Sequence, residues 1–284
     1  MAGSRHPIQM LWVSGALPWY AVMSINSFLH HRHRVELYAY DPPPNLPQGC
    51  VLKDAGQILP RDCVFVYKQG HHKGHLSGFS NWFRYALLAR HGGWWSDCDV
   101  ICVAPFWKIE QDYVFASEDK PPNPASANPN VMFVRTGSTE IMSKCAAYCE
   151  SRRDDIDHAE TGPVLLNDMA HKLELGNRIV GPGVFNPISF SDTGLFLGSS
   201  LMLTAKKYSR RVRNLRPIHM SRQTIGVHLY ASVLTQCGAV MSSAPDMPPR
   251  SFLAQLIRRH CQPQGALPLR QRFDWPTGPE VAAP

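Results

Sequence analysis

Two aspartates, Asp97 and Asp99, stand two positions apart in an otherwise largely apolar segment, residues 94–103. In an extended chain this spacing places both carboxylates on the same side. Two crowded carboxylates repel each other, and a divalent cation removes that cost. Mg²⁺ and Mn²⁺ prefer oxygen ligands and commonly keep positions open for phosphates. The pair therefore predicts a Mn²⁺ or Mg²⁺ site facing a phosphorylated ligand, although Asp-x-Asp pairs also occur in ordinary solvated turns.

The start of the chain predicts elements that could position this pair. Residues 8–13 form a short apolar run bounded by Pro7 and by Ser14-Gly15, which is typical of a buried strand. Residues 19–29 suit a helix, and residues 35–40 alternate as a second strand does. This β-α-β order indicates an α/β sheet with crossover helices, and we expect a third short strand at 64–67.

The segment 77–103 is the most informative. Apolar residues recur in it at helical spacing, so we expect a helix capped by Ser77 and ended by Gly92-Gly93. Strands are expected at 94–95 and 100–103, with the acidic pair between them. Polar residues at the carboxyl end of a strand stand where open α/β sheets bind ligands. Farther along, we expect strands at 113–116 and 131–134 and helices at 141–153, 162–175 and 251–260.

The run SNWFRYALLARHGGWWSDCDV resembles the DXD-containing sugar-binding segment of the GT32-type glycosyltransferases and of the clostridial glucosylating toxins. Those families share a pattern of roughly S-D-x-x-R-Y, a gap, and G-G-x-Y-x-D-x-D. The residues of this chain that fit it are Ser80, Arg84, Tyr85, Gly92, Gly93, Asp97 and Asp99. Three weaker matches are LWVSGALP near the start, TGPVLL at 161–166 and VHLYASVL at 227–234. Asn81 departs from the pattern, because the family usually has Asp there.

The resemblance implies roles for individual residues. Asp99 would ligate the metal directly, and Asp97 would touch the ribose and sugar hydroxyls or the metal. Arg84 would approach the sugar or the diphosphate, and His228 would be a third metal or phosphate contact. Trp12 could stack on the nucleotide base, or it could be an ordinary core residue; both roles are open. The remaining donor-binding candidates are Val13, Asn81 and Tyr85, and the candidate acceptor contacts are Glu118, Asp119 and Asn130.

The fold that the resemblance implies is GT-A, an α/β fold with a Rossmann-like nucleotide-binding sheet and flanking helices. We expect one domain over residues 1–240, with a nucleotide-sugar half at 8–103 and an acceptor-side half at 104–240, followed by a Pro-rich extension at 241–284. The implied activity is a retaining transfer of a sugar from a nucleotide-sugar, UDP-sugar rather than GDP-sugar, in polysaccharide biosynthesis. The acceptor would be a glycan, a lipid-linked saccharide or a protein. The alternative is a glycan- or nucleotide-binding protein of the same fold without transferase activity.

Composition narrows the class of protein further. The 284 residues are 44% hydrophobic and 18% charged, which suits a globular protein with a full core, and the net charge is +7. The sequence shows neither a long apolar run nor a secretory signal, so we expect a cytoplasmic protein. Two basic clusters, at 206–213 and 258–259, fit an anionic membrane surface as a peripheral partner. Aromatic residues are not interleaved with basic ones, so we expect no nucleic-acid partner.

Two histidine clusters, at 30–33 and 71–75, invite a zinc interpretation. Their flanking Arg and Lys residues and loop-like setting favour a solvated surface instead.

Overall fold

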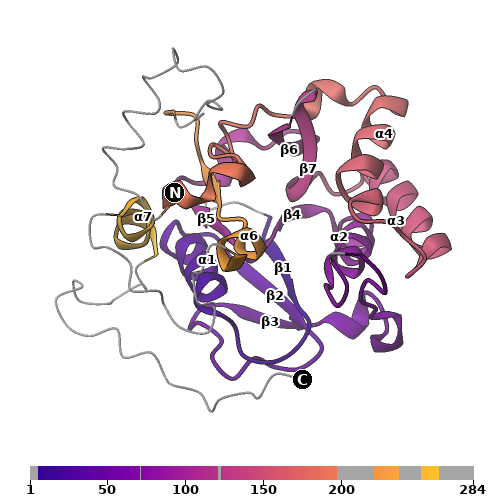
Figure 1. Ribbon diagram of the computed structural model, residues 1–284, viewed down its shortest axis with the longest axis horizontal. Coiled ribbons are helices and arrows are strands. Elements are labelled where there is room, and N and C mark those ends of the chain that lie inside the picture. Colours follow the sequence, from indigo (N-terminus) through magenta and orange to yellow (C-terminus); the bar gives the residue numbers. More distant parts are fainter. Residues whose placement is uncertain (1–5, 71, 121–122, 197–220, 237–250, 262–284) are drawn as a thin grey trace.

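The computed structural model describes residues 6–70, 72–120, 123–196, 221–236 and 251–261 of the chain. At its centre lies one six-stranded sheet with helices on both faces (Figure 1). In spatial order its strands are β3 (Val51–Asp54), β2 (Val35–Ala39), β1 (Ile8–Trp12), β4 (Gly93–Ser96), β7 (Asn123–Val134) and β6 (Tyr113–Lys120). The first four are parallel, and β7 and β6 continue the sheet antiparallel. The predicted α/β architecture is confirmed.

Helices cover the two faces of this sheet unequally. On one side lie α2 (Ser77–His91), α3 (Glu140–Arg152) and α4 (Leu165–Lys172), and on the other lie α1 (Trp19–His30) and α7 (Phe252–His260) (Figure 1). A second, two-stranded antiparallel sheet pairs β5 (Val100–Cys102) with β8 (Gly226–His228), and α6 (Ala231–Gln236) follows it. The short helical turns are Ala55–Gln57, Arg61–Cys63, Phe106–Ile109, Glu160–Val164, Gly176–Arg178 and Phe190–Phe196.

The alternation of side chains along the strands builds a core on each face of the sheet. Trp94 packs with the α1 layer, whereas its neighbour Trp95 packs with the layer of α2 and α3. In the same way Met132 and Phe133 of β7 point to opposite faces. All four side chains are at most 1% exposed. Because both faces of the sheet are covered, the central strands carry apolar side chains on both faces, as the run of bulky residues in the sequence indicates.

The second sheet is held against α1 by two serines. Ser24 donates its hydroxyl to the carbonyl of Val100 at 2.7 Å, and the Ser27 hydroxyl accepts from the Cys102 amide at 2.8 Å. Both serines are buried in the helix face that the hydrophobic residues of α1 otherwise form. These two bonds attach both ends of β5 to α1, and β5 begins directly after Asp99.

Most of the expected elements are present, and two expectations were wrong. Residues 64–67 form no strand, because Phe65 packs its ring against Phe79 of α2, and β3 instead occupies the sheet edge beside β2. Ser77 does not cap α2, because Leu76 stands in the cap position and Ser77 is the first residue of the helix. Gly92 does end α2, at φ 64°, and a Cβ there would lie 2.8 Å from the carbonyl oxygen of Val134.

The C-terminal region contains the predicted helix, α7, which buries Leu253, Leu256 and Ile257 against α1, β5 and their neighbours. The proposed boundary at residue 240 lies outside the described residues, as does the basic cluster at 206–213. In the described part of the chain, no helix combines the length and the apolar character needed to cross a bilayer.

The surface interpretation of the first histidine cluster was wrong for His33, which is 3% exposed. Its Nε2 accepts the amide of Phe106 at 3.0 Å, and the rings of Phe28 and Phe106 pack against it. Burial, with a smaller contribution from the charge of His31, lowers the pKa of His33 to about 3. A protonated ring would lose its acceptor and be a buried charge, so His33 is neutral in the folded protein.

This burial predicts an acid-dependent loss of stability. The folded pKa of His33 lies below the ordinary value of 6.5, so the unfolded chain binds the proton more tightly. The stability that neutral His33 contributes to the fold is therefore complete above pH 6.5, and it is lost as pH falls toward the folded pKa. Between pH 7.5 and 5.0 we expect His33 to reduce the free energy of unfolding by about 2 kcal/mol, measured by urea denaturation.

The variant His33→Gln should reduce the loss of unfolding free energy between pH 7.5 and 5.0 by about 2 kcal/mol, whatever its stability at pH 7.5. His171→Gln, at an exposed position of α4, is the matched control and should keep the slope of the parent protein. An unchanged slope in His33→Gln would contradict the assignment.

Candidate functional site

The order of the strands reverses between β1 and β4. From β1 the chain proceeds outward through β2 and β3, and it then returns to the other side of β1 with β4. Open α/β sheets bind ligands outside the carboxyl ends of the strands at such a reversal. Trp12 ends β1, and Asp97 directly follows β4. The thiol of Cys98 lies 3.4 Å from the carbonyl oxygen of Leu11, so the two strand ends meet there.

The segment from Asp97 to Asp99 is a turn, and the expectation of an extended stretch was wrong. The amide of Val100 reaches the carbonyl of Asp97 at 3.4 Å across this turn. The physical reason is that β4 belongs to the large sheet and β5 to the small one, so the chain must change direction between them. The two carboxylates are brought together by this turn rather than by strand alternation.

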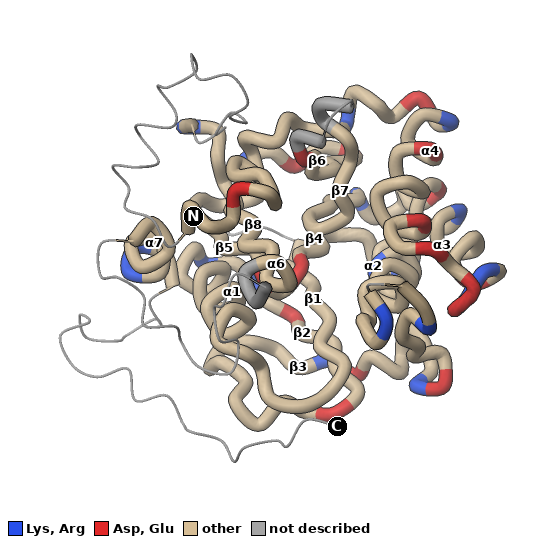
Figure 2. The backbone as a smooth tube through the Cα atoms, in the orientation of Figure 1, with Lys and Arg blue, Asp and Glu red and all other residues tan. Residues whose placement is uncertain are grey.

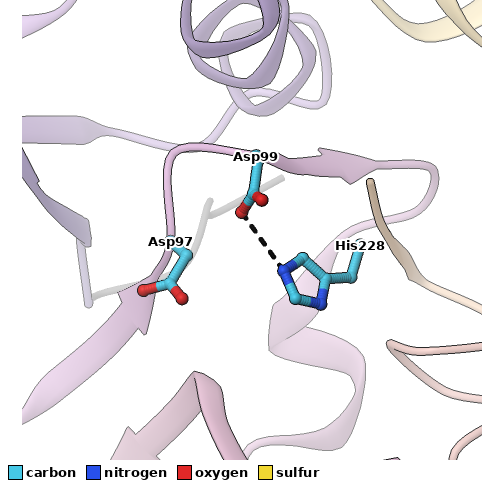
Figure 3. Close-up of side chains that lie close together, drawn as sticks. All are labelled: Asp97, Asp99 and His228. Carbon is cyan, nitrogen blue, oxygen red and sulfur yellow. Dashed lines mark ion pairs between the residues drawn. The ribbon is translucent and has the colours of Figure 1, made fainter. Parts of the chain in front are cut away.

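His228 joins the pair from a distant part of the chain. In the small sheet it is the register partner of Val100, the residue after Asp99. Its Nε2 lies 3.3 Å from Oδ1 of Asp99. The side chains of Asp97, Asp99 and His228 converge on one space from three directions (Figure 3). One ligand atom from each lies within 4.8 Å of the other two.

Asp99 is the more strongly held of the two carboxylates. Its Oδ2 accepts the amide of Ala231 at 2.9 Å, at the start of α6, so Oδ1 is directed at His228. Burial raises the pKa of Asp99, but the charge and hydrogen bond of His228 and the Ala231 amide outweigh it, and the net direction is downward. Burial lowers the pKa of His228, and Asp99 reverses this, so that the net direction is upward. Asp99 is therefore an anion at neutral pH.

Asp97 is held by Arg84 and Trp95. Nη2 of Arg84 lies 3.0 Å from Oδ1 of Asp97, and the indole Nε1 of Trp95 donates to the same oxygen at 2.9 Å. Burial raises the pKa of Asp97, Arg84 lowers it, and the nearby charge of Asp99 raises it again, with a net direction upward. The charge of Asp99 is one of the causes that raise the pKa of Asp97, so the two carboxylates repel each other. A bound cation would relieve this repulsion.

Arg84 acts as a clamp on the protein itself. Its guanidinium is 5% exposed and donates to the carbonyl of Pro129 at 2.6 Å and to the hydroxyl of Ser80 at 3.0 Å. Its Nε reaches the carbonyl of Ser80 at 3.2 Å, and the group lies over the ring of Trp95. Most of its donors are therefore used before any ligand arrives. The predicted contact with a donor sugar or diphosphate stays a prediction, and the contact in the structure is with Asp97.

The three converging side chains fit a divalent cation. Two ligands about 2.1 Å from one ion and at right angles to each other are about 3 Å apart, close to the 3.3 Å between Asp99 Oδ1 and His228 Nε2. The set of two carboxylates and one imidazole suits Mn²⁺ better than Ca²⁺, which prefers oxygen ligands throughout. One departure is that the Nδ1 of His228 is buried without a hydrogen-bond partner among the described residues, whereas metal-bound imidazoles usually donate from that nitrogen.

Of the other predicted donor-binding residues, two are partly buried and two are buried. Trp12 and Val13 are partly buried at the end of β1, beside the acidic turn, and the Trp12 indole donates to the carbonyl of Gly15 at 3.2 Å. Asn81 is 7% exposed and directs its amide at the Thr161 hydroxyl, 3.3 Å away. Tyr85 has no exposed surface, and its hydroxyl reaches the Gly162 carbonyl at 3.4 Å. Their proposed ligand contacts stay predictions.

A buried amide network that the sequence analysis missed supports the other side of the site. The carbonyl of Asn130 accepts the amide of Asp97 at 2.8 Å, and the Asn130 side chain bonds Asn186 at 2.9 Å. Asn186 also donates to the carbonyl of Ser117 at 2.8 Å. Glu118 is 8% exposed, and its charge contributes to raising the pKa of His228. Two candidate acceptor contacts, Glu118 and Asn130, thus lie beside the site, whereas no local sequence signal marks Asn186.

Comparisons with known proteins gave matches to solved structures alone. No family model and no curated protein matches the chain. One similar structure is the PaToxG glycosyltransferase, with a TM-score of 0.44 and 13% identity over 90% of this chain and 84% of that one. Another is the glycosyltransferase GlyE of Streptococcus pneumoniae TIGR4, with a TM-score of 0.42 and 13% identity over 78% of this chain and 54% of that one. A third is the galactosyltransferase LgtC in complex with donor and acceptor sugar analogs, with a TM-score of 0.40 and 9% identity over 84% of this chain and 98% of that one.

All three of these neighbours are glycosyltransferases by name. The chain spans about half the length of GlyE, at 54%. At TM-scores of 0.40 to 0.44 the similarity does not decide a function. The functional proposal rests on the site geometry and the sequence pattern.

Proposed function

We propose that this protein is a glycosyltransferase of the GT-A type, which transfers a sugar from a UDP-sugar to a saccharide or glycoconjugate acceptor. The observation that carries the proposal is the convergence of Asp97, Asp99 and His228 at the carboxyl ends of β1 and β4. The two aspartates lie within the composite pattern of arginine, paired glycines and paired aspartates that resembles the sugar-binding segment of sugar-nucleotide enzymes, and His228 lies in the weaker match at 227–234. The pattern and the strand reversal are independent features, and both point to the same crevice.

The protein's own residues would prepare this crevice for a pyrophosphate. Asp99 and His228 present an oxygen and a nitrogen on one side, and Arg84 with Trp95 fixes the orientation of Asp97 on the other. A divalent cation bound there, Mn²⁺ or Mg²⁺, would neutralise the charge that develops on the leaving diphosphate. The free Oδ2 of Asp97, which accepts no hydrogen bond among the described residues, would receive a ribose or sugar hydroxyl. Trp12 and Val13, at the adjacent strand end, would contact the uracil ring.

The proposal includes retention of the anomeric configuration and no protein nucleophile. The acceptor would approach the face of the sugar that the diphosphate leaves, and the leaving phosphate would take the acceptor proton. Most of the rate enhancement would then come from stabilisation of the charge that develops in the transition state. Glu118 and Asn130 would orient the acceptor, which we propose to be a glycan, a lipid-linked saccharide or a protein. In the cell the enzyme would be cytoplasmic and would associate through basic residues with an anionic membrane face, in polysaccharide biosynthesis.

Release of the nucleotide tests this proposal in the unmodified protein. Incubated with UDP-glucose, UDP-galactose, UDP-N-acetylglucosamine or GDP-mannose, the protein should release UDP from at least one UDP-sugar when Mn²⁺ is present. EDTA should abolish the release and added Mn²⁺ should restore it. Mn²⁺-dependent binding of UDP without any turnover would instead favour a nucleotide-binding protein of this fold. Absence of both binding and turnover would overturn the proposal.

A further inference from the structure

A cavity of about 500 Å³ has none of the three converging residues of the acidic site in its lining. Two loops enclose it, residues 67–70 with His72 on one side and residues 152–158 on the other. The second loop sits directly on the start of α2, because a Cβ on Gly78 would lie 2.6 Å from Cδ1 of Ile156. This volume is in the usual range for small-ligand sites, but the lining is polar and charged, so the cavity suits a polar ligand.

One face of α2 connects the cavity to the acidic site. Ser77, Ser80 and Arg84 recur at positions i, i+3 and i+7, so they lie along a single helix face. The start of this helix lies against Tyr67 of the cavity wall, because a Cβ on Gly78 would lie 3.2 Å from Cζ of Tyr67. Ser80 bonds Arg84, which in turn holds Asp97. At 1.5 Å per residue the two ends of this row are about 10 Å apart. The cavity therefore lies within reach of an extended molecule whose other end is at Asp97.

The charges of the cavity disfavour an anionic ligand. Its lining includes Asp154, Asp155 and Asp157 against two basic residues, Lys68 and Arg152. Lys68 pairs with Asp154 at 2.5 Å, and Arg152 pairs with Glu160 at 3.0 Å and with Asp155 at 3.6 Å. Charged residues of both signs crowd the end of the molecule that carries α3 and α4 (Figure 2). Both cations are thus already paired, and the remaining carboxylate oxygens would repel a phosphate or a nucleotide.

The aromatic rings of the cavity form a flat surface rather than a metal site. His72 and His158 stack with their centroids 3.5 Å apart and their planes at 9°, and Tyr67 lies 6.0 Å from His158. A metal ion lies in the plane of each imidazole that binds it, so two rings stacked face to face cannot share one ion. Carboxylates that accept hydroxyl hydrogen bonds, next to flat rings that pack on C–H groups, are what a neutral saccharide requires.

We propose that this cavity binds the part of a neutral oligosaccharide acceptor that lies beyond the reacting sugar. The acceptor role rests on the function proposed above, whereas saccharide binding by the cavity does not. Binding energy from this remote part would help to hold the acceptor hydroxyl at the reacting centre. Asp157, an exposed residue of the cavity wall, would accept hydrogen bonds from saccharide hydroxyls.

Saturation-transfer NMR with four tetrasaccharides, maltotetraose, cellotetraose, chitotetraose and mannotetraose, tests the proposal. At least one should receive saturation from the full-length protein, and Asp157→Asn should weaken its binding about tenfold, as expected for the loss of a hydrogen bond to a charged group. Asp168→Asn, an exposed aspartate on α4, is the matched control and should leave binding unchanged. Asp99→Asn should also bind the tetrasaccharide, because it alters the acidic site alone.

The outcomes separate this proposal from the proposed function. If none of the four tetrasaccharides receives saturation, or if Asp157→Asn binds as well as the parent protein, the cavity is not the saccharide site. If Asp99→Asn loses binding while Asp157→Asn keeps it, the saccharide sits at the acidic site and the inference is overturned. Saccharide binding in the cavity of a protein that releases no UDP would leave this proposal standing without its acceptor role.

Discussion

The variant Asp99→Asn is expected to lose Mn²⁺-dependent release of UDP by about a thousandfold or more, since several kcal/mol of charge stabilisation would be lost. Asparagine has the shape of aspartate and can still accept the Ala231 amide, which now bonds Oδ2 at 2.9 Å. The start of α6 should therefore keep its geometry. What the variant loses is the anionic oxygen that faces His228 and, with it, the charge that attracts a cation. Steady-state rates at saturating UDP-sugar, together with Mn²⁺ titration by calorimetry, measure both effects.

The control for this variant is Asp112→Asn. Asp112 is 54% exposed and pairs with Arg135 on the surface at 2.7 Å, so its loss should change neither the rate nor Mn²⁺ binding. Thermal unfolding of Asp112→Asn should stay close to that of the parent protein, whereas Asp99→Asn should unfold at a lower temperature, because it loses the ion pair with His228 that lowers the Asp99 pKa. A fully active, Mn²⁺-dependent Asp99→Asn variant would eliminate the proposed metal site.

The variant Arg84→Met is expected to reduce both stability and activity. Arg84 is 5% exposed and bonds Pro129, Ser80 and Asp97, so its removal leaves several acceptors unsatisfied and one carboxylate unpaired. Removal of one partner of a buried pair costs about 3–5 kcal/mol, and we expect about 2–3 kcal/mol here because Asp97 is 27% exposed. Lysine should not restore the loss, since a single ammonium cannot reach three acceptors in different directions. Urea denaturation at pH 7.5 measures the difference.

A double-mutant cycle tests whether Arg84 acts through Asp97. If it does, Arg84→Met combined with Asp97→Asn should be less destabilised than the sum of the two single variants, by at least 1 kcal/mol or so. Arg90→Met is the matched control on the same helix, because Arg90 is exposed and contacts the carbonyl of Gln57 alone among its described hydrogen bonds. Strict additivity in the cycle would show that Arg84 does not position Asp97.

Local patterns in the sequence predicted much of the α/β framework. β1, α1, β2, α2, β4 and β5 stand within a few residues of the expected ranges, since each has a periodicity that one element type satisfies. The failed strand at 64–67 shows the limit of this reasoning. A short apolar run can pair at a sheet edge or pack against a helix. Here Phe65 packs against Phe79 of α2, and the run forms no strand. Such a choice depends on which surface is available, and that surface lies outside the local window.

The acidic pair illustrates the same division at the candidate site. Its residue types and its position after a buried strand were readable, and they indicated a cation and a phosphorylated ligand. The reason first given for the closeness of the two carboxylates was wrong, because a turn between two separate sheets brings them together. The clamp by Arg84 and the amide network of Asn130 and Asn186 depend on buried contacts across the chain, which no spacing reveals.

By itself the sequence determined the chemistry that is available to this protein: two carboxylates at a strand end, an arginine on the preceding helix, and helices and strands with the right periods. Tertiary structure alone decided which groups meet. Pairing of β5 with β8 brings His228 to Asp99, and the reversal of strand order between β1 and β4 brings the end of β1 to the acidic turn, where Cys98 reaches Leu11. The physical reason is that residue types and the spacing of apolar residues can be read within a short stretch of the chain. Metal-ligand geometry instead requires contacts between residues far apart in sequence, which form when the two cores pack.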